Sequence, residues 1–182
     1  SDSALAYLNR IEESADLLDK PSSLRQWITI GRAEVYGIMG LYKSAATLLE
    51  QVHIQAEDKF LRLYYYQVAR SVYGWMADYG EVGESRKMLQ QLTANYRDSI
   101  LLVETNATNR AIVQADKLLN EGALQAGKEL CLRTLSHADS LQHVYLFALL
   151  ADLSEASNNH DDYLHYLSLA ALSDLERGVT EY

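Results

Sequence analysis

Residues 33–52 read AEVYGIMGLYKSAATLLEQV, and this stretch decides the fold of the chain. Apolar residues on both sides of Gly40 recur at spacings of three and four, the periodicity of an amphipathic helix. Gly40 stands between the two periodic runs, where a glycine commonly ends a helix. Ala33 and Ala45 are small enough to let two antiparallel helices approach closely. The stretch therefore predicts a helical hairpin.

The pattern around Gly40 recurs along the chain. A small residue is followed two positions later by a larger one, three later by a small one and four later by an apolar one. The instances are Gly40–Tyr42–Ala45–Leu49, Gly80–Val82–Ser85–Leu89, Gly122–Leu124–Gly127–Cys131 and, most degenerate, Asn158–His160–Tyr163–Leu167. They start 40, 42 and 36 residues apart, an interval typical of stacked helical hairpins.

Helical periodicity covers nearly the whole chain, and no alternating strand pattern is evident. We expect an all-α fold, a right-handed α-solenoid of about four antiparallel helix hairpins plus an N-terminal helix. No low-complexity linker divides the chain, so one domain is expected over residues 1–182, truncated at both ends relative to a longer native protein. The expected helices span 3–18, 24–39, 42–55, 57–79, 84–103, 107–120, 123–137, 140–157 and 161–175.

Composition restricts the classes of partner. The net charge is −9 and no basic stripe is visible, which argues against nucleic acid as a partner of this segment. No apolar run approaches the roughly 20 residues that span a bilayer, so no membrane contact is expected of this segment itself. Cys131 is the single cysteine, which precludes a disulfide within the chain and leaves the redox compartment open.

Short motifs that resemble reactive sites have simpler explanations. Gly122–Lys128 matches the glycine and lysine positions of a P-loop, but a helix precedes it and Glu129 replaces the required hydroxyl. The remaining candidates are a histidine–aspartate cluster without further ligands, a run of triad residue types too close together for triad geometry, and a cysteine in an apolar repeat position. They are His160–Asp161–Asp162 with His165, Ser136–His137–Ala138–Asp139–Ser140, and Cys131. We expect no catalytic site, cofactor or metal.

The repeat resembles the tetratricopeptide repeat, best of all in Ala33–Tyr36–Gly40–Tyr42–Ala45–Leu49–Val52. Thr29 stands where that family has a tryptophan, bulky Tyr73 stands where it has a small residue, and no unit ends in its proline. The opening residues 2–8 and the closing residues 166–176 are similar to a bacterial family of tetratricopeptide-type regulatory proteins.

Membership of that bacterial family would imply an export signal, an extracytoplasmic sensor region, one membrane span and a cytoplasmic tail. The resemblance thus implies a periplasmic module that binds a protein, peptide or small effector and belongs to a regulator anchored in the inner membrane. An intracellular scaffold or chaperone-like adaptor that uses the same groove is the alternative. An export signal and a span in the full-length gene product would decide between the two.

Two sets of residues are candidates for partner binding. On the expected helix 57–79, a polar stripe combines arginine with tyrosine, two residue types favoured at binding hot spots, although a solvated flank is the alternative. This stripe holds Arg62, Tyr66, Arg70 and Tyr73. In the tetratricopeptide superfamily the first helix of each hairpin lines a concave groove, which by resemblance assigns Trp27, Glu34, Arg70, Asn109, Asp116, Tyr145, Asp152 and Glu155. The mostly acidic set favours a peptide or protein segment with some positive charge.

Overall fold

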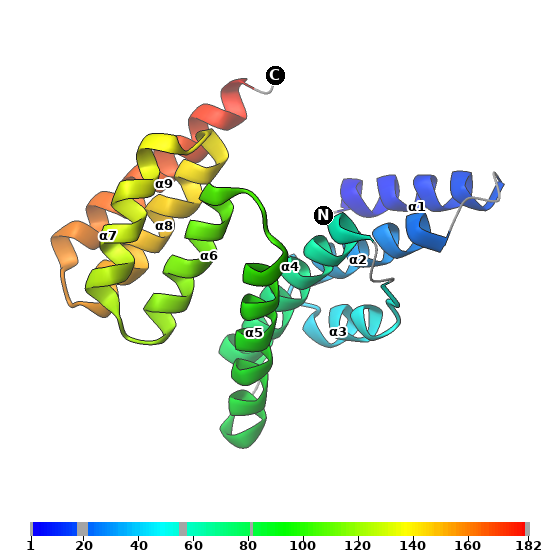
Figure 1. The fold of residues 1–182 in the computed structure, drawn as a ribbon. Helices are drawn as coiled ribbons and strands as arrows, with labels where there is room; N and C mark the ends of the chain where they lie inside the picture. The colour runs from blue at the N-terminus through cyan, green and yellow to red at the C-terminus, as the bar shows by residue number, and fades with distance from the viewer. Residues whose placement is uncertain (1, 18–21, 55–57, 81, 181–182) are drawn as a thin grey trace. The chain divides into compact units, whose positions relative to one another are not determined.

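The computed structural model describes residues 2–17, 22–54, 58–80 and 82–180 (Figure 1). Throughout this part of the chain the regular structure is helical, and no strand occurs in it. The chain forms two compact units, residues 1–103 and 104–182. The predicted all-α class and the succession of helix hairpins are confirmed.

The first unit holds α1 (Asp2–Leu17), the hairpin of α2 (Ser22–Ile38) and α3 (Tyr42–Glu50), and the hairpin of α4 (Lys59–Trp75) and α5 (Gly83–Val103). Helix α2 packs against α1, α3 and α4, and α3 also contacts α4. The core of this unit lies among α2, α3 and α4. Its fully enclosed side chains include Ile30, Ala33, Ala45, Leu49 and Val72.

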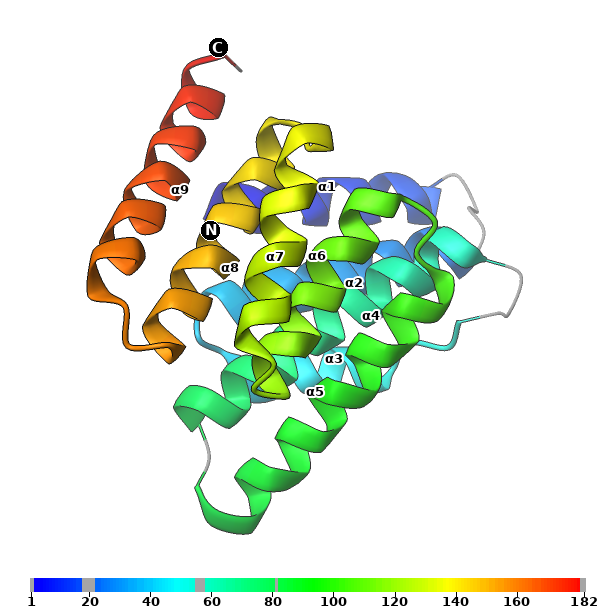
Figure 2. The ribbon, with the colours of Figure 1, turned by 60° about the vertical axis from the view of Figure 1, so that its left-hand side comes forward.

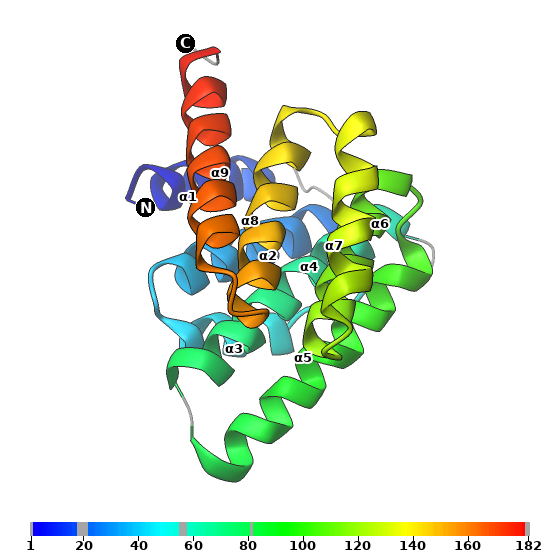
Figure 3. The same cartoon turned by 90° about the vertical axis from the view of Figure 1, so that its left-hand side faces the viewer.

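The second unit holds the hairpin of α6 (Ala107–Asn120) and α7 (Leu124–Thr134) and the hairpin of α8 (Ser140–Ala156) and α9 (His160–Thr180). Figure 2 shows α6 beside α7, and Figure 3 shows α8 beside α9. Helix α8 also packs against both α6 and α7. The core contains Ala115, Cys131, Leu146, Leu150 and Leu153.

Three of the hairpins turn in the same way. Gly40, Gly122 and Asn158 have φ angles of 78°, 76° and 56°, the left-handed conformation that ends many helices. In each hairpin the next amide donates a 2.9 Å hydrogen bond to a carbonyl five residues earlier, as in a Schellman motif. In these three hairpins the repeated sequence pattern therefore marks the same left-handed C-terminal end of the first helix.

The hairpin of α4 and α5 turns differently. The expected helix 84–103 agrees with α5 to within one residue, whereas the expected helix 57–79 is α-helical only over Lys59–Trp75. Helix α4 changes at Met76–Gly80 into a π-helical turn, and the left-handed residue is Gly83, with φ 64°, instead of Gly80. Residues 76–79, which were expected to continue the α-helix, belong instead to this wider π-helical turn. Boundaries also shift elsewhere: α3 ends at Glu50, α7 continues into a short 3-10 turn at Leu135–His137, and α9 runs to Thr180. The expected end positions 18, 55 and 57 lie outside the described residues.

Candidate partner-binding surfaces

An aromatic pair joins α2 and α4 in the first unit. The rings of Trp27 and Tyr64 stack with their centroids 4.9 Å apart and their planes inclined by 19°. The Trp27 residue is 38% exposed, so part of its indole remains accessible to a partner. Trp27 was expected in the binding surface, whereas Tyr64 was not among the candidate residues. The structure places both in one feature.

Glu34 belongs to the same feature as the aromatic pair. The Tyr64 hydroxyl donates a 2.6 Å hydrogen bond to the Glu34 carboxylate, which lies about two turns along α2 from Trp27. Gly31 lies between them on the helix, and a Cβ there would be 3.4 Å from Leu8 Cδ2 and 3.5 Å from the Tyr64 hydroxyl, both ordinary contact distances. Burial, followed by the hydrogen bond to Glu34 and its negative charge, raises the pKa of Tyr64, which keeps the phenol protonated as a donor.

The tyrosines of the second expected stripe lie next to Tyr96 of α5, and one of them is buried. Tyr73 is 8% exposed and stacks on Tyr96 of α5, with centroids 5.8 Å apart and an interplanar angle of 1°. Its ring is therefore core, which removes it from the candidate surface. Tyr66 is half-buried, with its ring 6.0 Å from that of Tyr96. Arg62 and Arg70 are half-buried on the same helix.

Burial also governs the phenols of this cluster. It raises the pKa of Tyr73 to about 12, with smaller contributions from Tyr96 and Glu50. Burial and the neighbouring Tyr96 hydroxyl, 3.3 Å away, likewise raise the pKa of Tyr65. The cluster is thus a set of neutral, mutually packed rings that hold α4 against α5.

In the second unit, three of the expected residues bring their charges together. Partial burial is the main cause that raises the pKa of Asp152 on α8, and the charges of Glu155 on the same helix and of Asp116 on α6 raise it further. Asp152 and Glu155 are exposed, whereas Asp116 is half-buried and accepts a 3.3 Å hydrogen bond from Asn120. The arrangement is an acidic patch across two neighbouring helices.

The other two residues expected in the second unit lie apart from that patch. Asn109 is engaged in the packing of α6 against α8: its side-chain oxygen accepts a 2.8 Å hydrogen bond from Gln142. Tyr145 is 53% exposed and lines a hollow of about 420 Å³ between α8 and α9. The hollow is lined by Leu141, Val144, Tyr145, Leu167, Ala170, Ala171, Asp174 and Arg177.

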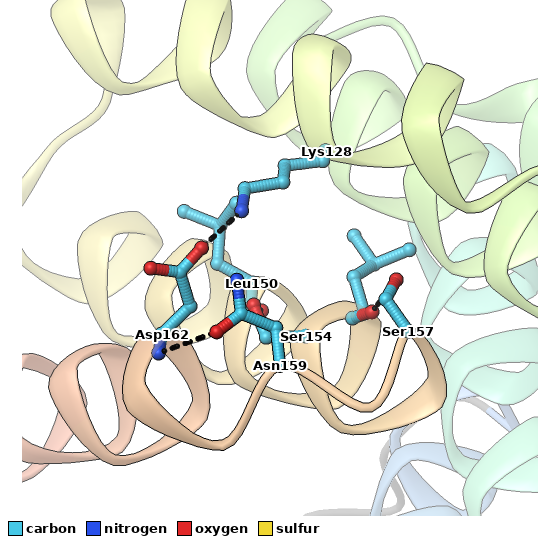
Figure 4. A network of polar contacts seen from close by, with 7 residues as sticks. Lys128, Leu150, Ser154, Ser157, Asn159 and Asp162 are labelled. Carbon is cyan, nitrogen blue, oxygen red and sulfur yellow. Dashed lines mark hydrogen bonds and ion pairs between the residues drawn. The ribbon is translucent and has the colours of Figure 1, made fainter.

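Residues of the P-loop-like and histidine–aspartate motifs contact one another in the second unit. Lys128 of α7 forms an ion pair with Asp162 of α9 (Figure 4). Its ammonium also lies over the ring of Tyr166, 5.8 Å from the ring centroid. Asn159 caps α9 by accepting a 3.2 Å hydrogen bond from the Asp162 amide. Gly127, in the repeat's small position, is buried against Leu153.

The remaining reactive residue types are also engaged in structure. Asp139 and Gln142 form a capping box at the start of α8. Cys131 is fully buried, and burial raises the pKa of its thiol to about 12. The described residues contain no group of three or more potential metal ligands, and none of their helices combines the length and apolar character of a membrane span.

Comparison with known proteins identifies one family. The family model described as "SusR N-terminal TPR domain" matches residues 1–182, the whole chain. No curated protein and no solved structure matches the chain. TPR denotes the tetratricopeptide repeat, so the resemblance seen in the repeat pattern agrees with the family match.

Proposed function

Because the chain belongs to the family of SusR N-terminal TPR domains, we propose that it binds a protein or peptide segment for a bacterial regulatory protein. In that protein it would serve as the sensor or assembly region. TPR domains generally bind proteins or peptides, and repeat families of this kind are generally not enzymes. The proposal adds to that general role a position in a regulator that is anchored in a membrane.

The proposal rests on one observation: the first helix of a hairpin in each unit has polar or aromatic side chains that remain at least partly exposed to solvent. In the first unit these are Trp27 and the Glu34 carboxylate held by Tyr64; in the second they are Asp152 and Glu155. Exposed indole offers a large apolar contact, and the carboxylates offer charge and hydrogen-bond acceptors. Such surfaces favour a segment that carries positive charge, which also fits the net charge of −9.

A selection from a random peptide library displayed on phage tests the binding role with the full chain. We expect enrichment of sequences that then bind the purified chain saturably, as synthetic peptides, at micromolar concentration. Variants Trp27→Leu and Asp152→Asn, screened separately, report which unit holds each sequence. If no enriched peptide bound saturably, the proposed function would be wrong.

The cellular location requires a separate test. We propose an extracytoplasmic position, with an inner-membrane anchor outside the residues given. A reporter fused within the full-length gene product, active only outside the cytoplasm, measures it. Activity supports the sensor role, whereas a cytoplasmic result favours the scaffold or chaperone-like adaptor.

A further inference from the structure

We propose that Trp27, Tyr64 and Glu34 form a subsite for one cationic side chain, preferentially arginine, of the bound segment. The inference rests on the proposed function and specifies the chemistry of its ligand. It takes the three side chains as one unit, because Tyr64 contacts both of the others. Nothing in the sequence pattern alone joins α4's Tyr64 to residues of α2.

The geometry aligns an aromatic surface with a carboxylate. Trp27 and Glu34 are seven positions apart on α2, which is close to two helical turns and places them on the same face. Tyr64 bridges them: its ring stacks on Trp27 at 4.9 Å and its hydroxyl holds Glu34 at 2.6 Å. Tyr64 occupies one face of the indole and one acceptor position of Glu34, so a planar cation would use the exposed part of Trp27 and the remaining acceptor positions of the carboxylate.

The local charges favour a cation. An ionised carboxylate has acceptor sites beyond the one that Tyr64 uses, and the face of an indole attracts positive charge. Arg32, the nearest cationic position to Glu34 along α2, is directed to α1, where its guanidinium bonds Glu12 at 2.7 Å and Asn9 at 2.9 Å. An anionic ligand would be repelled by the negative charge of Glu34, and a neutral ligand would gain only the contact with the aromatic rings.

Arginine suits the subsite better than lysine does. Its guanidinium is planar, stacks on aromatic faces and donates two parallel hydrogen bonds to a carboxylate, whereas the lysine ammonium is a compact and strongly hydrated charge. The expected preference is therefore Arg over Lys, and either over a neutral side chain of the same shape.

Citrulline, the neutral isostere of arginine, provides the sharpest comparison. The probes are Ac-Gly-Arg-Gly-NH₂ and Ac-Gly-Cit-Gly-NH₂, titrated at low salt into the full chain while the Trp27 indole N–H signal is followed by NMR. The chain has two tryptophans, so Trp75→Phe assigns that signal. We expect a saturable shift with the arginine probe and an affinity about fivefold weaker for citrulline, from cation–π and ion-pair contributions.

The variant Glu34→Gln keeps an acceptor for Tyr64 but removes the charge, and should lower the affinity for the arginine probe about threefold. The matched control Glu84→Gln removes one exposed carboxylate from α5 of the same unit and should leave that affinity unchanged. Equal affinity for both probes, an unchanged Glu34→Gln variant, or no saturable shift would each overturn the subsite. The phage selection judges the binding role independently, because it requires no basic residue in the enriched peptides.

Discussion

At the scale of single residues, close contacts between helices depend on side chains that are small or absent. A Cβ at Gly37 would lie 2.8 Å from the Trp75 ring and 3.0 Å from Val72, so α2 and α4 approach to a separation that only glycine permits there. At Gly74 the nearest atom to such a Cβ is Thr93 Cγ2 at 3.7 Å, an ordinary contact. Both glycines are inside helices, which makes them a matched pair.

Gly37→Ala should therefore lower the free energy of unfolding by about 1 kcal/mol, because overpacking outweighs the gain in helix propensity. Gly74→Ala should raise it by roughly 0.5–1 kcal/mol, since only the propensity gain remains. Urea denaturation followed by circular dichroism measures both. Equal effects of the two substitutions would contradict the close approach of α2 to α4.

The buried tyrosines predict weakening at alkaline pH. The pKa of Tyr73 is raised from 10.0 to about 12 in the folded chain. Between these values the unfolded chain loses the proton while the folded chain keeps it, so stability falls as pH rises from 10 toward 12. The loss reaches at most about 2–3 kcal/mol. Denaturation midpoints measured across this range should fall less steeply for Tyr73→Phe, whereas Tyr7→Phe, an exposed control, should behave as the parent.

At the scale of helices and turns, three of the four patterns start at a residue with the same left-handed backbone conformation: Gly40, Gly122 and Asn158. Gly40 and Gly122 have open space around the missing Cβ, so their requirement is the positive φ angle and not crowding. Asn158 adopts the same conformation with a side chain, which costs more than glycine does. The fourth pattern therefore starts with asparagine instead of glycine but has the same left-handed turn conformation.

Two opposite substitutions test this requirement. Gly122→Ala should destabilise the chain by about 1 kcal/mol, and Asn158→Gly should stabilise it by a few tenths to about 1 kcal/mol. Thermal unfolding of both variants checks the signs. A stabilising Gly122→Ala would mean that the left-handed turn does not limit the hairpin.

The elements were predictable because helix periodicity and turn glycines are local properties. The π-helical turn at Met76–Gly80 was not, because Gly80 and Gly83 are both turn signals and the repeat pattern starts at Gly80, whereas the left-handed conformation is at Gly83. The contact of Tyr64 with Trp27 and Glu34 was also missed. It depends on how α2 lies against α4, which the periodicity of either helix alone does not give.

At the scale of the whole molecule, the chain carries a separate probe in each compact unit. Both tryptophans, Trp27 and Trp75, belong to residues 1–103, and the single cysteine, Cys131, belongs to residues 104–182. The thiol is buried, so it reacts with alkylating reagents only after opening. The expectation of one domain over residues 1–182 can thus be measured directly.

If residues 1–182 unfold as one domain, tryptophan fluorescence and Cys131 alkylation will give the same urea midpoint. This is the result we expect. Midpoints that differ beyond experimental error would show that the two units unfold independently. The comparison uses the unmodified chain and so needs no variant that could disturb either unit.

The central claim is that side chains on the first helices of the hairpins bind a partner segment. The most direct measurement is the affinity of one phage-selected peptide for the parent chain, for Trp27→Leu with Glu34→Gln, and for Asp152→Asn with Glu155→Gln, by isothermal titration calorimetry. Loss of an aromatic hot spot should weaken binding at least about fivefold in one of the double variants. Unchanged affinity in both would contradict the account.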